Sequence, residues 1–131
     1  ELSPRLINSM IRTLLDWKRQ LLINGKQYYD FIYITDAAKA FRLIGEYGVV
    51  GTRYTIASGT VRPLRDFLEE VAMLVSPKAE LGFGELQFNG VYLHKEDYSI
   101  EHLQNDTGFF PEVTFEEGIV NTRDWIINTE M

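Results

Sequence analysis

Residues 29–41 read Tyr-Asp-Phe-Ile-Tyr-Ile-Thr-Asp-Ala-Ala-Lys-Ala-Phe, and they carry the change from strand to helix that decides the fold class. In the first half, aromatic side chains alternate with others, a composition that favours a pleated strand. In the second half the alanines favour a helix, which we predict over 36–45 with Thr35 and Asp36 at its cap. A strand that leads directly into a helix indicates the α/β class.

The segment before this stretch predicts a β-hairpin. Asn24 and Gly25 tolerate the positive φ angles of a type I′ turn, and they separate an apolar run at 21–23 from a longer run at 26–34. We therefore expect the two runs to pair with each other as antiparallel strands.

Helical and strand patterns continue along the rest of the chain. The further predicted elements are a helix at 4–17 that Ser3 and Pro4 begin, strands at 52–58, 80–86 and 91–93, and helices at 63–75, at 98–106 and from 114 to near the C-terminus. Trp17, Phe41 and Trp125 belong to the apolar sides of these helices, so we expect them to pack in the core. The element order predicts one α/β unit over residues 1–131.

The composition excludes several classes of function. Thirteen Lys and Arg against nineteen Asp and Glu give a formal net charge of −6, whereas nucleic acids and anionic membranes attract basic surfaces. Without cysteine the chain has neither disulfides nor thiolate metal sites, and we expect His94 and His102 to face solvent and bind no zinc. No apolar run approaches the roughly 20 residues of a membrane span. We therefore expect a cytoplasmic protein that binds no metal, nucleic acid or membrane.

Residues 45–51 form a literal G-x-x-G-x-x-G string. A dinucleotide-binding loop needs its glycines between a strand and the N-terminus of a helix, where backbone amides meet the pyrophosphate. Here the glycines follow a predicted helix and precede a predicted strand. The string therefore predicts the end of a helix rather than a cofactor loop.

The residues alone predict no catalytic group. The chain has no Gly-x-Ser-x-Gly elbow near a histidine, and nothing selects a glycosidase-like pair among the carboxylates. The aromatic residues between 28 and 33 could stack on a nucleotide base, although an aromatic strand is more typical of a core face.

Residues 29–41 resemble the Arg-Asp-Phe-Ile-Tyr-Val-x-Asp-x-Ala-x-Ala segment of the NAD-dependent epimerase/dehydratase family, the extended short-chain dehydrogenase/reductases that act on nucleotide sugars. Residues 51–59 look like the family's Gly-x-x-Tyr-x-Ile-x-x-Gly strand, and 63–75 look like the helix that follows it. Residues 107–119 are similar to the family's ending, with Trp125 in the terminal helix. These segments are those of the C-terminal portion of the family's Rossmann-type fold.

The resemblance implies that the chain is the substrate-side part of a protein more than twice as long, an epimerase, dehydratase or reductase that uses NAD or NADP. The family's Tyr-x-x-x-Lys is absent, because no lysine here has a tyrosine four residues before it. The strand-linked glycine loop is absent as well. The resemblance therefore implies an isolated chain that binds no cofactor and is inactive, in a parent that is an NAD-dependent isomerase or oxidoreductase.

The resemblance also implies a substrate-binding set. Leu21, Leu22 and Ile23 match the segment that lies beside the nucleotide base in the family. Tyr29 takes the place of an arginine that binds the diphosphate, and Gln87 falls near a second such arginine by spacing. Since neither position holds an arginine, we expect weak diphosphate binding.

The partners that the resemblance implies are a nucleotide sugar and the missing N-terminal half. The helix at 36–45 and the strand at 52–58 would pack against that half, so we expect an exposed apolar patch and self-association. The alternative is a stand-alone α/β binding or assembly module without enzymatic activity. The sequence upstream of Glu1 in the gene separates the two interpretations.

Overall fold

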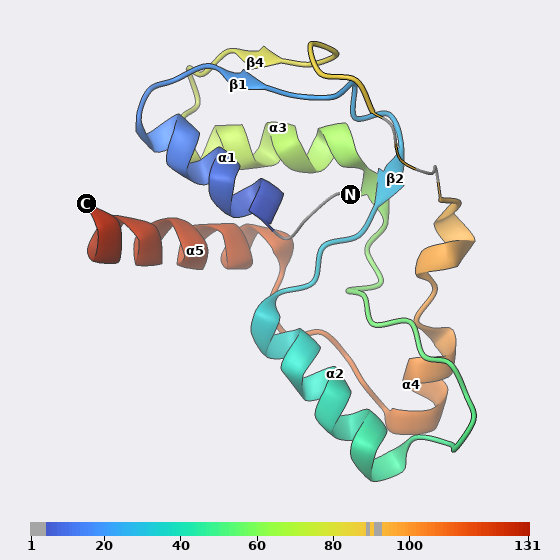
Figure 1. The fold of residues 1–131 in the computed structure, drawn as a ribbon. Helices are drawn as coiled ribbons and strands as arrows, with labels where there is room; N and C mark the ends of the chain where they lie inside the picture. The colour runs from blue at the N-terminus through green and yellow to red at the C-terminus, as the bar shows by residue number, and fades with distance from the viewer. Residues whose placement is uncertain (1–4, 89, 91–92) are drawn as a thin grey trace.

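A computed structural model describes residues 5–88, 90 and 93–131 (Figure 1). Its elements, in chain order, are α1 (Arg5–Leu15), β1 (Gln20–Leu21), β2 (Tyr28–Tyr29), α2 (Ile34–Tyr47), β3 (Arg62–Pro63), α3 (Leu64–Val75), β4 (Leu81–Gly82), the 3-10 helix η1 (Lys95–Tyr98), α4 (Glu101–Thr107) and α5 (Phe115–Glu130). Helices dominate this part of the chain, and the strands are short. The predicted start of the first helix at Ser3 and Pro4, and most of the strand predicted at 91–93, lie outside the described residues.

The larger hydrophobic core lies where α1, α3 and α5 pack together. On α1 the buried residues Ile7, Met10, Ile11 and Leu14 recur at helical spacing, so one face of the helix enters the core. The other buried members are Leu22, Leu64, Leu68, Val71 and Ala72, with Ile119 and Ile126 of α5.

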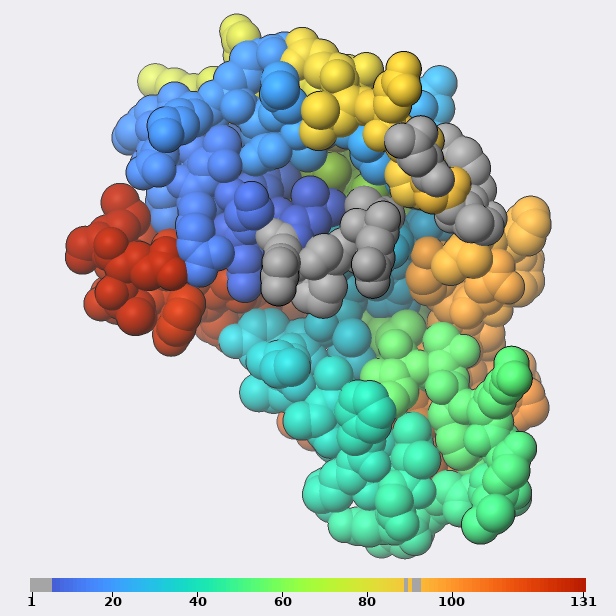
Figure 2. Space-filling model, in the orientation of Figure 1, coloured from blue at the N-terminus to red at the C-terminus, as the bar shows by residue number. Residues whose placement is uncertain are grey.

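A second, smaller core joins α2 to α4. Ala40 of α2 packs with Leu103 of α4 and with the buried residues Ala57, Ile100 and Phe109. Figure 2 shows α2 and the segment after it projecting from the rest of the molecule as a separate lobe.

The predicted hairpin is wrong, because its two strands pair with distant segments instead. β1 pairs in parallel with β4, and β2 pairs antiparallel with β3. Gly25 has a positive φ of 71°, but its carbonyl accepts a hydrogen bond from the amide of Arg65 (2.8 Å). The first amides of a helix have no hydrogen-bond acceptor within the helix, and the turn supplies one at the start of α3. A Cβ at position 25 would lie 3.0 Å from the backbone of Arg65, so the close approach requires glycine.

The strand predicted at 52–58 is also wrong, since the segment forms no ladder with the described residues. It is held by its side chains instead. Tyr54, Ile56 and Ala57 pack into the smaller core, and the Tyr54 hydroxyl donates to Asp106 (2.7 Å). The strand at 80–86 shortens to the two residues of β4.

Three aromatic residues that were predicted in the core are exposed. The first helix ends at Leu15, before Trp17, which has a φ of 59° and is 85% exposed. Phe41 of α2 is 66% exposed and Trp125 of α5 is 56% exposed. Helical spacing alone therefore overestimated the width of the buried faces.

The predicted helix boundaries with clear local signals are confirmed. α3 begins directly after Pro63 and ends at Val75, with Ser76 as its C-cap, as expected. Thr114 caps α5 in a capping box with Glu117. The helix predicted at 98–106 appears as η1 and α4, which Gly108 ends in the left-handed conformation.

Candidate functional site

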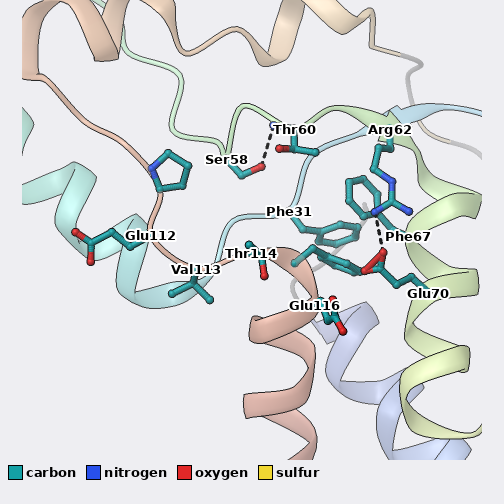
Figure 3. Close-up of a pocket in the computed structure, with 12 residues that line it drawn as sticks. Phe31, Ser58, Thr60, Arg62, Phe67, Glu70, Glu112, Val113, Thr114 and Glu116 are labelled. Atoms are coloured by element: carbon teal, nitrogen blue, oxygen red, sulfur yellow. Dashed lines mark hydrogen bonds and ion pairs between the residues drawn. The ribbon is translucent and has the colours of Figure 1, made fainter.

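The candidate site is an open cavity of about 440 Å³ between the segment that leads into β3 and the start of α5 (Figure 3). A cavity of this size suits a small-molecule ligand. Its lining combines aromatic rings, hydroxyl groups and charged side chains, namely Phe31, Ser58, Thr60, Arg62, Phe67, Glu70 and residues 111–116.

Three phenylalanine rings make up the apolar part of the cavity. The ring of Phe31 lies 5.1 Å from that of Phe67 and 5.7 Å from that of Phe115, and the last two rings are 4.7 Å apart. Phe67 is buried, whereas Phe31 and Phe115 are half-buried. Because the three rings brace one another, they form a rigid surface for a ligand.

Arg62 and Glu70 form the charged wall of the cavity. Arg62 Nη1 lies 3.2 Å from Glu70 Oε1, and each side chain is 30% exposed. The guanidinium also stacks over the ring of Phe67, 4.5 Å from its centroid. Figure 3 shows the two charged groups facing each other beside Phe31 and Phe67.

A buried carboxylate holds one side of the cavity. Asp30 accepts hydrogen bonds from the amide and hydroxyl of Ser58 (2.9 and 2.6 Å) and from the amide of Gly59 (2.9 Å). Desolvation by burial raises the pKa of Asp30, although these hydrogen bonds act in the opposite direction. The contacts fix the segment that leads to Thr60 and Arg62.

A second buried carboxylate, Asp36, holds the opposite side. The prediction that it caps a helix is wrong, because Tyr33 occupies the N-cap position and Asp36 lies in the first turn of α2. Its two oxygens accept hydrogen bonds from the amides of Glu112 and Val113 (3.0 and 2.9 Å). Asp36 therefore anchors the loop that lines the cavity before α5.

Some residues of the predicted substrate-binding set lie close together, but they lie outside the cavity. Leu21 and Leu22 lie beside the β4 segment, where the amide of Leu86 donates to the carbonyl of Leu22 (3.1 Å), and the exposed Gln87 follows. Leu22 is only 2% exposed and faces the core, so a ligand there would meet Leu21 and Ile23 instead. We call Leu21, Ile23 and Gln87 the rim.

Tyr29 lies on β2 and is not one of the rim residues. It lies next to the cavity. Its ring contacts those of Phe31 (4.7 Å) and Tyr98 (5.9 Å). Burial, followed by the charge of Asp30, raises the pKa of its hydroxyl. Its direct partner across the β2–β3 pair is Arg62. Position 29 itself holds no arginine, but an arginine lies opposite it on the neighbouring strand. Sequence reasoning missed Arg62, because only the strand register reveals this placement.

The cavity offers apolar rings, hydroxyls and charged groups to a ligand. The cavity lining holds no histidine, and His94 and His102 are exposed as predicted. Within residues 5–88, 90 and 93–131, no three His, Cys, Asp or Glu side chains converge as metal ligands. None of the helices in this described part has the length and apolarity needed to cross a bilayer.

The glycine string at 45–51 lies where the sequence predicted it, at the C-terminal end of α2. The amide of Gly48 donates to the carbonyl of Ile44 (2.8 Å), so this amide is not available to a phosphate. A cofactor pyrophosphate needs free amides at a helix N-terminus. These residues therefore do not fit a nicotinamide cofactor.

Comparison with known proteins links the chain to a family of enzymes. The model of the NAD dependent epimerase/dehydratase family matches residues 1–57. A dTDP-glucose 4,6-dehydratase of Xanthomonas campestris is 25% identical over 82% of this chain and 33% of its own length. The same enzyme from Escherichia coli is 27% identical over 82% of this chain and 32% of its own length. The chain spans about a third of the length of these relatives.

Solved structures show the same fold. A UDP-N-acetylglucosamine 4-epimerase from Methanobrevibacter ruminantium, in complex with UDP-N-acetylmuramic acid, superposes with a TM-score of 0.80 at 23% identity, covering 98% of this chain and 41% of that one. A dTDP-glucose 4,6-dehydratase from Bacillus anthracis, in complex with NAD, gives 0.77 at 23% identity over 95% and 40%. The fold is thus part of the Rossmann-type architecture of extended short-chain dehydrogenases. Sequence and fold agree, and they confirm the resemblance of this chain to the NAD-dependent epimerase/dehydratase family.

Proposed function

We propose that this chain is the C-terminal, substrate-side part of an NAD(P)-dependent nucleotide-sugar epimerase, dehydratase or reductase. The observation that carries the proposal is the joint match of sequence and fold to enzymes named for dTDP- and UDP-sugars, of which the chain covers 33%, 15% and 41% of the length. The cofactor and the proton-transfer tyrosine would belong to the rest of the parent protein, a cytoplasmic enzyme. The chain alone would be inactive.

The rim and Tyr29 would receive the nucleotide. Leu21, which is 44% exposed, and Ile23 offer apolar contact to a base, and the exposed amide of Gln87 can donate and accept hydrogen bonds. Tyr29 has one hydroxyl where the family has an arginine, so the diphosphate gains no charge-assisted bond there. These groups would orient the nucleotide and take no part in the chemical step.

Nuclear magnetic resonance titration with UDP and dTDP tests the proposal. We expect amide shifts at Leu21, Ile23, Tyr29 and Gln87 with a dissociation constant in the millimolar range, because no arginine clamps the phosphates. Leu21→Gln is expected to weaken binding. The control is Ile127→Gln, which changes an apolar side chain of similar exposure (38%) on α5 and is expected to leave binding unchanged.

Shifts that avoid the rim and Tyr29, or no shifts at all, would contradict the proposal and favour a stand-alone binding module. The upstream gene sequence gives a second test. The proposal expects a strand-linked glycine loop and a Tyr-x-x-x-Lys there.

A further inference from the structure

The charged groups of the cavity between β3 and α5 are mostly acidic. The lining contains the carboxylates of Glu70, Glu112 and Glu116 and the guanidinium of Arg62. In the view of Figure 3, Glu70 and Glu112 lie on opposite sides of Phe31, so the carboxylates are distributed around the cavity. The lining therefore attracts a cation and repels an anion.

Ion pairs compensate only part of this negative charge. Arg62 contacts Glu70 Oε1 at 3.2 Å, and Lys39 of α2, which is not a lining residue, pairs with Glu112. Glu116 is exposed and forms no hydrogen bond or ion pair of its side chain with the part of the chain that the structure describes. The second oxygen of Glu70, Oε2, accepts no hydrogen bond from these residues either. Both carboxylates can therefore accept hydrogen bonds from a ligand.

The two buried carboxylates behind the lining add to the negative potential. Asp30 accepts hydrogen bonds from the lining residue Ser58, and Asp36 accepts one from the amide of the lining residue Val113. Within the described residues, all donors to these two carboxylates are uncharged amides or a hydroxyl. Solvent screens buried charges weakly, so their field reaches the cavity. With Lys39 included, two cations are present against five carboxylates.

Aromatic rings supply a second attraction for a cation. Phe31 and Phe115 are half-buried, and their ring centroids are 5.7 Å apart. The face of a phenyl ring attracts a cation, and its apolar surface also packs against hydrocarbon. The guanidinium of Arg62 makes such a contact with Phe67, 4.5 Å from the ring centroid. Phe31 and Phe115 keep part of their surface for a ligand.

We propose that this cavity binds an ammonium group on a short hydrocarbon stem. The ammonium would donate to Glu116 and to Oε2 of Glu70, and the stem would lie against Phe31 and Phe115. A cavity of about 440 Å³ accommodates a ligand of this size. The inference goes beyond the proposed function, because the rim and Tyr29 do not line the cavity.

Titration of the whole chain with n-butylammonium chloride at neutral pH, followed by amide shifts, tests this inference. The amine is protonated under these conditions. We expect saturable shifts around Glu70, Glu116 and Phe115. At the same ionic strength, 1-butanol has the stem without the charge and sodium butyrate has the opposite charge, and neither is expected to give saturable shifts. Ammonium chloride has no stem and is expected to bind more weakly.

A free amine and a lysine side chain of another protein share this chemistry. Nα-acetyl-lysine methylamide has the same ammonium and stem, with main-chain atoms attached. Binding at least as tight as that of butylammonium would identify a lysine side chain as the ligand. Weaker binding would identify a free amine, because the main-chain atoms do not fit.

Charge substitutions in the lining are expected to have effects of opposite sign. Glu116→Gln and Glu70→Gln are each expected to weaken butylammonium binding about threefold, since each removes an attractive charge. Arg62→Gln is expected to strengthen binding about threefold, since it removes the cation of the lining. A purely structural role of Arg62 would give no gain in affinity.

Matched controls come from the neighbouring ion pair on the same helix. Arg65 and Glu69 pair at 3.0 Å on the exposed side of α3, and neither lines the cavity. Arg65→Gln and Glu69→Gln are expected to leave butylammonium binding unchanged. If a variant of Arg62 or Glu70 fails to fold, Glu116→Gln still tests the inference, because Glu116 is exposed.

Three outcomes would overturn the inference: no saturable shifts in the cavity, equal shifts with 1-butanol, or equal losses of affinity in the control variants. Weak shifts spread over the whole acidic surface would overturn it as well. Titration with UDP separates this inference from the nucleotide proposal. UDP shifts at the rim with no response of the cavity to butylammonium would overturn the ammonium site alone. Butylammonium shifts in the cavity with no response of the rim to UDP would overturn the nucleotide proposal alone.

Discussion

Asp30 and Asp36 show how single side chains shape the candidate site. Both are buried, at 9% and 2% exposure, and both accept backbone amides from segments far along the chain. Each fixes one of the two loops that border the cavity. These loops contain no regular structure of their own, so the carboxylates replace the missing backbone ladder.

The raised pKa of Asp30 predicts a dependence of stability on pH. Because burial raises the folded-state pKa above the ordinary value of 3.8, the folded protein favours the protonated acid. Its contribution to the free energy of unfolding is therefore full below the ordinary aspartate pKa and is lost as the pH rises through the raised value. Asp30→Asn is expected to remove this loss, measured by urea unfolding over a pH series.

The control for this prediction is Asp66→Asn, at an exposed position of α3. The stability of wild type relative to Asp30→Asn is expected to fall with pH across that interval. Asp66→Asn removes the same kind of side chain from an exposed position, and it is expected to leave the pH dependence that Asp30 causes in place. Parallel curves for wild type and Asp30→Asn would show that burial of Asp30 leaves its titration unchanged in the folded state.

At the level of elements, local signals predicted helices well and strands poorly. Pro63 before α3, the Thr114–Glu117 capping box and Gly108 after α4 each act within a few residues, so the sequence pattern contains them. β1 pairs with β4 some sixty residues away, and such pairing depends on contacts that no local pattern encodes. The same reason explains the false hairpin.

The site was predictable only in part, for a related reason. The resemblance singled out Tyr29, and the structure places it next to the cavity. Arg62 was missed because its position opposite Tyr29 depends on the register of β2 and β3. The resemblance placed Leu22 beside the nucleotide base, but its side chain lies in the core, since alternate residues of an extended segment point to opposite sides.

Helix α2 presents an apolar stripe to solvent. Ile34 (73% exposed) and Phe41 (66%) lie on one face with the exposed small residues Ala38 and Gly45, at spacings of four, three and four. We propose that this face packs against the N-terminal part of the parent protein, and that the isolated chain self-associates through it.

Substitution of Phe41 tests this self-association. Phe41→Gln is expected to reduce the concentration-dependent rise in mass measured by sedimentation velocity, because it removes the largest apolar contact of the stripe. Met73 is 71% exposed on α3, where its exposed helix neighbours Arg65, Asp66 and Glu69 are charged. Met73→Gln is therefore the control and is expected to change nothing. A wild-type chain that stays monomeric at high concentration would contradict the prediction.

At the scale of the whole molecule, the chain has two hydrophobic cores and a projecting α2 lobe. The chain covers 33% of the Xanthomonas dehydratase and 40% of the Bacillus anthracis structure, so most of each relative has no counterpart here. The segment at 52–58 is extended but pairs with no described strand. Under the proposal above, the missing part of the parent protein would cover this segment and the exposed face of α2.

The central claim is that this chain serves the substrate and leaves the cofactor to the rest of the parent protein. Titration of NADH and NADPH into the 131-residue chain, followed by nicotinamide fluorescence, tests it most directly. The Bacillus anthracis dehydratase, whose structure contains NAD, serves as the positive control. We predict no saturable binding to this chain at micromolar concentrations, because its glycine string ends a helix instead of beginning one. A micromolar dissociation constant would contradict the account.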